Sequence, residues 1–511
     1  MASLNKKQNP AAASPLRGRA HKITTAQPTT VNKAGGKAFD QADEEKFLFI
    51  LLTSFFEDEF YRTSQDTVTE LQQLIKKINP VFAAQAILYA RTKFGMRSIC
   101  HVAAAILANT VKGQRWTKEF FSQLLYRVDD AAETIAAYYH LYGKTLPNSM
   151  KKGFAKGMLK FDAYQLAKWR GEKKAVTLYD VFNLVHPKPT PELAETYRQL
   201  MRGELKSTDT WESQLSAVGQ SVDEEDQVTA KAEIWSNLLD AGKLGYLALL
   251  RNLNNILKTG DDKLIDKAAA ALLNEQAIKG ALILPFQFGS AYDRLMKEGY
   301  GNSASSRRLI AALEEAVEIS LNNVPVFPGN TLVAMDVSWS MTNVHKGRKG
   351  VSKSPAIIGA MFAAVIARSN NADLLVFDWT ARQLRYGLNS SIMSIRDDLA
   401  SKCRGSSTDF GSIFTGLEGV RYDRIIILSD MQAWIGETQQ EFRAYCERTK
   451  ADPILYCFDL SSYGTLQFPA EHVYSLAGFS DKTLSIMRAL ETDRKAAVNA
   501  VREIVIPYAE G

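Results

Sequence analysis

The chain has 511 residues, which is too long for a single hydrophobic core, so we expect at least two domains. Its 62 lysines and arginines against 56 aspartates and glutamates give a formal net charge of +6, and no apolar run approaches the ~18 residues that a membrane-spanning helix needs. Four scattered cysteines without a C-x-x-C pair argue against a disulfide framework and a zinc site, and no secretory segment follows the N-terminus, so we expect a cytoplasmic protein that does not enter a membrane.

The first feature along the chain is a basic tail. Residues 1–39 hold seven lysines and arginines and no acidic residue, so the rest of the chain is nearly neutral. Residues 1–30 are rich in Ala, Ser, Thr, Gln and Pro and have few large apolar side chains, which predicts a disordered segment. A basic disordered arm can hold nucleic acid. A solubilising tail without a partner explains the same composition equally well.

From Asp40 to Val324 the sequence predicts helices almost throughout. Apolar residues recur there at helical spacing in segments joined by short turns. These segments are 47–56, 67–78, 80–94, 98–111, 118–128, 130–142, 149–156, 163–170, 178–184, 192–201, 229–241, 245–258, 262–274 and 305–322. No strict sequence period is visible. Many helix pairs with short connections nevertheless predict an α-solenoid, in which each pair buries its apolar face on its neighbours.

Residues 151–174 form a basic segment with interleaved aromatic residues. Its cations are Lys151, Lys152, Lys156, Lys160, Lys168, Arg170, Lys173 and Lys174, and its aromatic residues are Phe154, Phe161, Tyr164 and Trp169. Such a cluster of cations can neutralise phosphates, and exposed aromatic rings can stack on unpaired bases. Aromatic residues at helical spacing are more often core, and we expect this for Phe154, Phe161 and Trp169.

Arg251 and Asn252 lie inside an apolar helical segment and are predicted to be buried. A buried arginine requires paired acceptors. We therefore expect a structural brace between repeats at this position rather than a contact with RNA.

After Asn323 the pattern changes from helices to alternating strands and helices. The predicted strands are 331–336, 372–377, 424–429 and 453–458, and the predicted helices are 354–368, 411–418, 438–448 and 482–490. This alternation is typical of βαβ units with a parallel sheet and right-handed crossovers. The domain boundary is expected near residues 325–328.

Oxygen-bearing side chains follow two of the predicted strands. They are Asp336, Ser338 and Ser340 after the first strand, Thr408 in a Gly/Ser-rich loop, and Asp430 after the strand 424–429. Loops at the carboxyl ends of such strands form the ligand site of open α/β sheets. Hard oxygen donors suit Mg²⁺ or another hard divalent cation. This D-x-S-x-S…T…D pattern resembles the metal-ion-dependent adhesion site of von Willebrand factor A domains.

The two parts together resemble the TROVE-domain proteins, the Ro autoantigens and their bacterial relatives. The matching stretches are Asn32–Gly36, Lys46–Thr53, Phe60–Tyr61, Trp211–Glu212, Ala232–Trp235, Ala248–Leu253, Leu284–Phe286, Leu321–Val324, Val333–Ser338, Ser407–Asp409 and Gly478–Ser480. The resemblance implies an α + α/β fold, in which an α-helical ring of HEAT-like repeats is closed by a Rossmann-like von Willebrand factor A domain. The implied organisation is a tail at 1–30, a TROVE helical-repeat domain at 31–324 and the von Willebrand factor A-like domain at 325–511.

The resemblance also implies partners and RNA-contacting residues. The expected partners are a Y-like small RNA, misfolded or single-stranded RNA ends, and a 3′-to-5′ exoribonuclease, with the chain acting as a monomeric ring. His186 and Lys188 match a segment in which the family places an RNA-contacting histidine. We find no P-loop, no G-x-S-x-G motif and no nuclease-like carboxylate array, so we do not expect an enzyme. The alternative is a Mg²⁺-dependent protein-interaction scaffold in which RNA binding is incidental.

Overall fold

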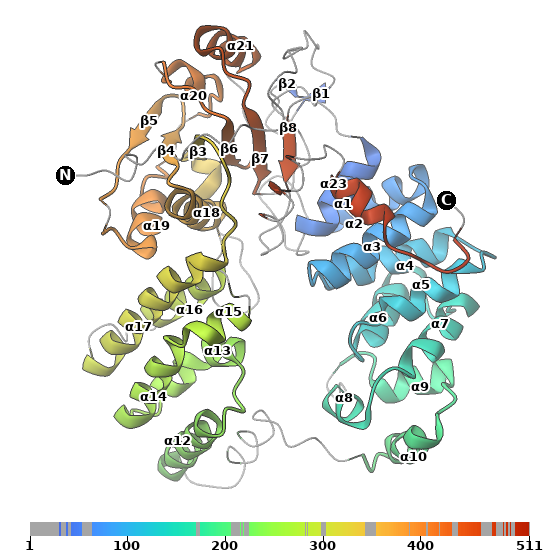
Figure 1. Cartoon of the computed structure of the whole chain (residues 1–511). Coiled ribbons are helices and arrows are strands. Elements are labelled where there is room, and N and C mark those ends of the chain that lie inside the picture. Colours follow the sequence, from blue (N-terminus) through green and yellow to red (C-terminus); the bar gives the residue numbers. More distant parts are fainter. Residues whose placement is uncertain are drawn as a thin grey trace. The chain divides into compact units, whose positions relative to one another are not determined.

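A computed structural model of the chain describes residues 30–31, 37–38, 42–53, 64–169, 174–205, 215, 218, 224–281, 283, 285–297, 303–342, 354–387, 389–404, 407–417, 419–431, 438–460, 473–476, 484, 487–488, 491 and 496–509. The chain divides into two compact units, whose elements are labelled in Figure 1. Unit 1 comprises residues 1–40 and 210–492, and unit 2 comprises residues 41–209 and 493–511. Unit 2 therefore contains both the first helices and the last residues of the chain.

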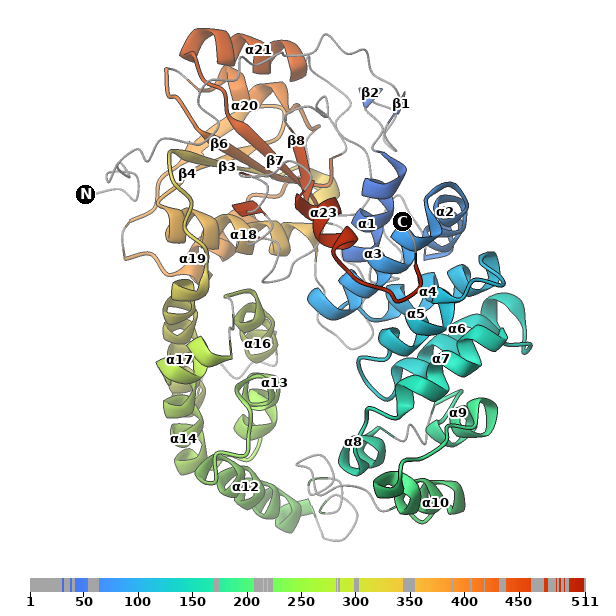
Figure 2. The same ribbon diagram turned by 45° about the vertical axis from the view of Figure 1, so that its right-hand side comes forward.

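Unit 2 is a stack of helices. They are α1 (Asp43–Thr53), α2 (Ser64–Lys77), α3 (Pro80–Lys93), α4 (Ser98–Thr110), α5 (Trp116–Leu124), α6 (Asp130–Tyr142), α7 (Asn148–Met158), α8 (Ala163–Lys168), α9 (Leu178–Val185), η1 (Pro191–Leu193), α10 (Ala194–Arg202) and α23 (Ala496–Arg502). Contacts join α1 to α3, α2 to α4, α4 to α6, α5 to α7 and α7 to α9. From α1 to α5, and at α7, each helix thus packs on the helix two places along the chain, as expected for a solenoid, and Figure 2 shows α3 to α7 following one another in this stack.

Local signals set where several of these helices begin. Asn79 caps α3, because its side chain accepts hydrogen bonds from the Val81 and Phe82 amides, and Pro80 occupies the first turn. Capping boxes start α8 at Asp162 and α9 at Thr177. Helix α8 belongs to the predicted basic segment, and α9 ends just before His186. The local sequence therefore sets where both helices begin.

Helices α5 and α7 lie close together because two glycines of α7 face α5. A Cβ atom at Gly153 would lie 2.5 Å from the Cβ atom of Phe121, and Gly157 has similarly little room. Phe154 packs edge-on against Phe121 with ring centroids 5.5 Å apart. Phe154 and Phe161 are both buried. Their predicted placement in the core is confirmed.

The last residues of the chain pack on α3 and α5 within unit 2. Gln85 on α3 donates hydrogen bonds to the carbonyl oxygens of Arg502 and Ile504, at 3.2 and 2.9 Å. The Arg115 guanidinium, just before α5, lies 3.9 Å from the ring centroid of Tyr508. A C-terminal segment whose Arg502 lies 417 residues after Gln85 is therefore part of the same compact unit.

The helical part of unit 1 contains two helices that were not predicted. Its helices are α12 (Glu224–Asp240), α13 (Tyr246–Leu257), α14 (Asp262–Leu272), α15 (Glu275–Gly280), α16 (Pro285–Lys297), α17 (Ala304–Ser320) and η3 (Leu321–Asn323). α13 contacts α14 and α16, and α17 contacts α14, α15 and α16. The unpredicted helices are α15 and α16. Helix α16 was not predicted because Pro285 and Gly289 are residue types that usually interrupt helices. Pro285 stands in the first turn, however, where its missing N–H is not needed.

The prediction that Arg251 is buried is wrong. Arg251 is exposed on α13, whereas Asn252 is buried and donates a hydrogen bond to the Ala248 carbonyl at 2.9 Å. The apolar residues before Arg251 do not all face the core, because Leu247 is itself 38% exposed. An apolar neighbourhood in the sequence therefore did not imply burial at this position.

The strands of unit 1 form one six-stranded sheet of order β5-β4-β3-β6-β7-β8. The strands are β3 (Thr331–Asp336), β4 (Asp373–Phe377), β5 (Ala381–Leu384), β6 (Arg424–Ser429), β7 (Ile454–Asp459) and β8 (Val473–Leu476), and a separate pair joins β1 (Thr30–Val31) to β2 (Lys37–Ala38). Neighbouring strands of the six-stranded sheet are parallel except β4 and β5, which are antiparallel. The predicted strands 331–336, 372–377, 424–429 and 453–458 are confirmed, whereas β5 and β8 were not predicted.

Both faces of the sheet are covered, as a parallel sheet requires. The helices are η4 (Trp339–Thr342), α18 (Pro355–Asn370), α19 (Ile392–Ser401), α20 (Gly411–Thr415) and α21 (Thr438–Thr449). α20 and α21 share a buried cluster with one face of β3, β4, β6 and β7, and α18 contacts β3, β4 and β6. Most of the predicted helix 482–490 lies outside the described residues. Within the described part of the chain, no helix is long and apolar enough to cross a membrane.

Candidate metal and RNA-binding sites

The predicted metal site is built on the last residue of β3. Asp336 is fully buried and accepts two hydrogen bonds, from the Ser338 amide at 2.8 Å and from the Ser429 hydroxyl at 2.6 Å. The hydroxyl oxygens of Ser338 and Ser340 lie 3.2 Å apart. The tight turn after β3 thus gathers the three oxygen donors of the D-x-S-x-S pattern at one end of the strand.

The remaining two donors lie at the same edge of the sheet, which is the edge formed by the carboxyl ends of the parallel strands. The strand order reverses between β3 and β6, and ligands bind at the carboxyl ends of strands at such a switch point. Asp430 follows β6 directly and is buried. The loop of Thr408 is tied to the carboxyl end of β4, because the Asp409 amide donates to the Asp378 carbonyl at 2.9 Å. Thr408 is also buried.

The donor set suits a hard divalent cation. Burial raises the pKa of Asp336 to about 6, although hydrogen bonds from Ser429 and Ser338 act to lower it, and the charge of Asp378 raises it. Among the described residues there is no group of three or more His, Cys, Asp or Glu side chains that would hold a metal. A cation at this edge would therefore depend on the hydroxyl oxygens as well as on the two carboxylates, which is chemistry that Mg²⁺ accepts.

The residues that sequence reasoning missed at this edge are Ser429 and Asp378. Both are signalled in the sequence only by position, since each stands at the end of a strand beside Asp336. Two tryptophans also lie on these loops: Trp339 is 55% exposed and Trp379 is 63% exposed.

The predicted RNA-binding lysines fall into two groups. On α7 and just after it, Lys156 forms an ion pair with Glu119 at 2.6 Å, and Lys160 donates to the Ser122 carbonyl at 3.1 Å. Burial lowers the pKa of Lys160. These two lysines tie α7 to α5. Among the described residues, Lys151, Lys152 and Lys168 form no ion pair, and Arg170 and Lys173 lie outside the described residues.

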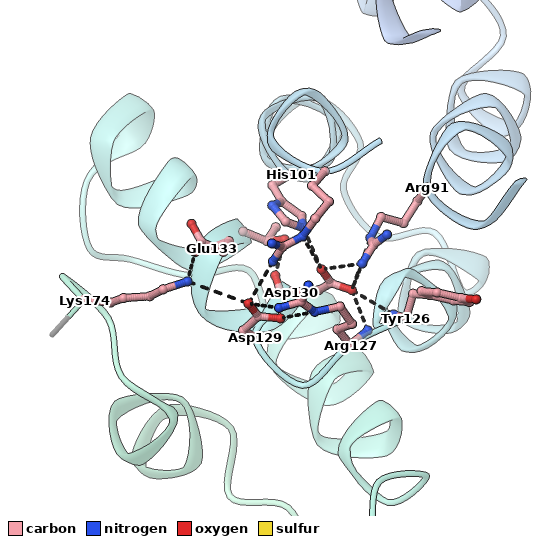
Figure 3. A network of polar contacts seen from close by, with 10 residues as sticks. Arg91, His101, Tyr126, Arg127, Asp129, Asp130, Glu133 and Lys174 are labelled. Atoms are coloured by element: carbon pink, nitrogen blue, oxygen red, sulfur yellow. Dashed lines mark hydrogen bonds and ion pairs between the residues drawn. The ribbon is translucent and has the colours of Figure 1, made fainter. Parts of the chain in front are cut away.

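Beside the basic segment lies a buried acidic residue, Asp130, at the start of α6 (Figure 3). It accepts hydrogen bonds from the Arg91 guanidinium at 2.9 Å and from the Arg127 amide at 2.7 Å, and its oxygen lies 3.0 Å from the His101 ring nitrogen. Burial alone would raise the pKa of Asp130, but these partners outweigh it and lower the pKa to about 2. Asp130 therefore holds α3, α4 and α6 together.

The neighbouring residue Asp129 collects a second set of cations (Figure 3). It accepts hydrogen bonds from Arg97 at 2.8 Å and from Arg127 at 3.0 Å. Lys174 forms ion pairs with Glu133 and, at 3.7 Å, with Asp129. Lys174 is thus a partner of these carboxylates, which reduces the charge that it offers to a phosphate.

The remaining predicted residues are at the surface. His186 ends α9 in the left-handed conformation, with φ of 46°, and is exposed, as is Lys188. Tyr164 is 51% exposed, whereas Trp169 is partly buried, with the Arg127 guanidinium 3.5 Å from its ring centroid. The prediction of a core position is therefore wrong for Trp169, which serves as a stacking partner of an arginine.

Comparison with known proteins gives three concordant findings. A sequence model of the TROVE domain matches residues 195–302. The RNA-binding protein RO60 of Deinococcus radiodurans is 22% identical over 478 residues, which are 80% of this chain and 84% of that protein. The crystal structure of the Deinococcus radiodurans RO (RSR) protein matches with a TM-score of 0.61 and 19% identity, covering 91% of this chain and 100% of that one. Residues 195–302 thus match the TROVE domain, and the chain is Ro-like in sequence and in fold.

A second kind of relative matches a shorter part of this Ro-like protein. Telomerase protein component 1 of Mus musculus is 21% identical over 317 residues, which are 45% of this chain and only 12% of that protein. The Rattus norvegicus protein of the same name gives the same shares. The chain therefore spans a small part of these relatives. The TROVE match at 195–302 includes α12 to α16. It contains neither the basic segment nor the residues that are predicted to bind a metal.

Proposed function

We propose that this Ro-like protein is a non-catalytic, cytoplasmic RNA-binding component of a ribonucleoprotein. It binds Y-like small RNA and single-stranded ends of misfolded RNA in noncoding-RNA quality control, as a monomer, and hands RNA to a 3′-to-5′ exoribonuclease. The observation that carries the proposal is the similarity to an RNA-binding protein over 84% of that protein's length, together with the same fold. The similarity to telomerase component 1 is consistent with an RNA partner.

The contacts in unit 2 support a choice among the predicted cations. Lys156 and Lys174 already have carboxylate partners, so they contribute less than their exposed neighbours. Lys152 and Lys188 are exposed and form no ion pair among the described residues. Lys168 lies near the rings of Tyr164 and Trp169, which leaves its charge uncompensated. We therefore assign the structured-RNA contact mainly to Lys152, Lys168 and Lys188, with His186 beside them.

This assignment is tested by removing the three lysines together. In the Lys152→Ala, Lys168→Ala, Lys188→Ala variant we expect weaker binding of a hairpin RNA at physiological salt. Each lost phosphate contact should reduce the slope of log affinity against log salt by roughly 0.9. The matched control removes three exposed lysines of unit 1, Lys243, Lys263 and Lys279. Both variants lose the same charge, so a general electrostatic effect would weaken them equally.

Binding is measured by fluorescence anisotropy over a series of salt concentrations. If the triple variant and the parent bind the hairpin with the same affinity and salt slope, these lysines are a solvated surface. If the parent binds no RNA at all, the RNA function itself is wrong.

A metal at the sheet edge is part of the same proposal. Asp336, Ser338, Ser340, Thr408 and Asp430 would hold Mg²⁺ or another hard divalent cation. Such a cation supplies a positive centre that binds an anionic oxygen of a partner. The support is the buried carboxylate surrounded by hydroxyl donors at the topological switch point.

One observation favours the alternative function of a Mg²⁺-dependent protein-interaction scaffold. Trp339 and Trp379 expose large aromatic surfaces on the loops of the metal edge, and tryptophan is enriched where proteins bind proteins. The two functions are separated by copurification. RNA that stays with the protein at moderate salt after removal of divalent cations supports the RNA function, and RNA-free protein supports the scaffold.

A further inference from the structure

The C-terminal segment, residues 503–509, lies on α3 and α5 within unit 2 (Figure 2). Two glutamine side chains bind its main chain. Gln85 on α3 donates a hydrogen bond to the Ile504 carbonyl at 2.9 Å. Gln123 on α5 donates a hydrogen bond to the Val505 carbonyl at 3.1 Å. Because every residue has a backbone carbonyl, these bonds hold a peptide without selecting its side chains.

Two side chains of the C-terminal segment make its specific contacts. Ile506 is buried. The Arg115 guanidinium lies 3.9 Å from the ring centroid of Tyr508, which is the geometry of a cation–π contact. Val505, in contrast, is exposed and adds little contact of its own. The surface therefore recognises an aliphatic side chain and, two residues later, an aromatic ring.

The C-terminal segment does not fill the groove in which it lies. A hollow of about 550 Å³ remains, and its walls include Val81 and Phe82 on α3 and Ile504 of the segment. The two charged residues of its lining, Glu44 and Arg502, form an ion pair with each other at 2.9 Å. Such walls suit an apolar group without charge. A group larger than the isoleucine side chain would remove more of the apolar wall from water.

We propose that this groove on α3 and α5 is a docking site for a peptide segment of a partner protein, and that the C-terminal segment is an occupant which the partner replaces. The partner's segment is apolar and carries three side chains in order. An aromatic side chain at the place of Ile504 fills the hollow, and an aliphatic one takes the buried position of Ile506. A second aromatic side chain takes the position of Tyr508 beside Arg115. This inference goes beyond the proposed RNA function and does not depend on it.

The hollow favours such a partner, because it is continuous with a surface that already binds a peptide. The C-terminal segment has the advantage of its covalent attachment, which gives it a high effective concentration in the groove. A partner must therefore bind more tightly than a free copy of this segment, and an aromatic side chain in the hollow supplies the difference. Segments that bury few side chains open locally at a low cost in free energy. The groove can thus be exposed to a partner while α3 and α5 stay folded.

The test measures peptide binding to the full-length protein by fluorescence anisotropy. The probes are two fluorescein-labelled synthetic peptides, one a copy of residues 503–511 and the other the same peptide with Ile504→Trp. The protein is the Ile506→Ala, Tyr508→Ala variant, whose own segment competes weakly for the groove. We expect this variant to bind the copied peptide about tenfold more tightly than the parent does, since the intact segment of the parent occupies the groove. The Ile504→Trp peptide should bind about tenfold more tightly than the copy.

A second pair of substitutions locates the binding. Adding Gln85→Ala and Gln123→Ala to the same variant removes the hydrogen bonds to the peptide main chain and should weaken binding of both peptides about tenfold. The matched control adds Gln73→Ala and Gln199→Ala, which lie on α2 and α10 and outside the lining of the hollow. This control should leave both affinities unchanged. The melting temperature of each variant reports on its folding.

The Ile504→Trp substitution in the full-length chain gives a readout that needs no weakened segment. The larger side chain fills the hollow from within the chain, so it should raise the melting temperature and slow amide hydrogen exchange in residues 504–509. An unchanged or lower melting temperature overturns the inference. So does a folded Ile506→Ala, Tyr508→Ala variant that binds neither peptide, or peptide binding that persists after loss of Gln85 and Gln123. RNA takes no part in these measurements, so their failure leaves the proposed RNA function as it stands.

Discussion

Asp130 and Asp336 are both fully buried, but they are surrounded by different partners. Asp130 is hydrogen-bonded to Arg91 and lies against His101, so cationic or ring donors hold its pKa low. Asp336 accepts hydrogen bonds from the Ser338 backbone amide and from the Ser429 hydroxyl, and burial holds its pKa high. A buried carboxylate with neutral donors and two nearby serine hydroxyls has the surroundings of a ligand site, whereas Asp130 has those of a structural ion pair.

The metal proposal gives a prediction at the scale of single residues. Calorimetry of the full-length parent should show binding of Mg²⁺ or Mn²⁺, and a concentration about 100 times the dissociation constant should add about 2.7 kcal/mol to the free energy of unfolding. Asp336→Asn should lose this binding and this gain, because the amide cannot supply the negative oxygen. In the absence of metal its melting temperature should stay near that of the parent, since the substitution removes a buried charge.

The matched control for this prediction is Asp373→Asn. Asp373 is the first residue of β4 and therefore lies at the amino ends of the parallel strands, away from Asp336, where it accepts a hydrogen bond from Tyr422. Its replacement should leave metal binding intact. Metal affinity that is unchanged in Asp336→Asn, or absent from the parent, would contradict the site.

At the scale of elements, sequence reasoning succeeded where the signal is local. The runs 331–336 and 424–429 have apolar interiors, at 332–335 and 425–428, and the structure confirms both strands. β5 was missed because it is an edge strand with exposed Arg382 and Gln383, so it lacks the apolar pattern. A short strand with charged residues protects the sheet edge from pairing with other chains.

The partners of charged side chains could not be predicted, because they come from other helices. Lys156 on α7 and Lys174 after α8 belong to one basic segment of the sequence, but Glu119 on α5 and Glu133 on α6 supply their counterions. These pairs span 37 and 41 residues. Arg251 was predicted to be buried because its neighbours in the sequence are apolar. It is exposed because it lies on the outer face of its helix.

The close contact of α5 and α7 gives a prediction about packing. Replacing Gly153 by Ala in an open helix would stabilise the protein by about 1 kcal/mol. Here the new Cβ atom would lie 2.5 Å from Phe121 Cβ and 2.6 Å from the Lys118 carbonyl, so the helices must move apart. Overpacking of this kind costs roughly 1–3 kcal/mol or more. We expect Gly153→Ala to lower the free energy of unfolding by about 1–2 kcal/mol, measured by urea denaturation.

The control for this substitution is Gly280→Ala. Gly280 is exposed at the end of α15, and a Cβ atom there would meet nothing within 4 Å. Its replacement should be neutral or slightly stabilising. A Gly153→Ala protein as stable as the parent would show that α5 and α7 separate at little cost.

At the scale of the whole molecule, the chain leaves unit 2 after residue 209 and returns to it at residue 493. The change from helices to strands after residue 324 was predicted, but this return was not. The reason is that Gln85 and Arg115 bind backbone and ring atoms of a C-terminal segment whose own sequence carries no signal of a partner. Contacts within unit 2 therefore hold the last residues of the chain against its early helices.

These contacts of the C-terminal segment give the last prediction. Deleting residues 503–511 removes the Ile504 carbonyl from Gln85, takes the Tyr508 ring from Arg115 and removes the buried side chain of Ile506. Loss of a buried isoleucine alone costs roughly 2–5 kcal/mol. We expect a lower melting temperature and faster amide hydrogen exchange in α3 and α5, read by mass spectrometry, while exchange in β3 and β6 stays at the parent rate. Deleting residues 1–29 is the control at the other terminus: that basic segment has little apolar surface to bury, so the melting temperature should not change. Exchange in α3 that is the same with and without the last nine residues would show that the C-terminal segment only rests on unit 2 and does not stabilise it.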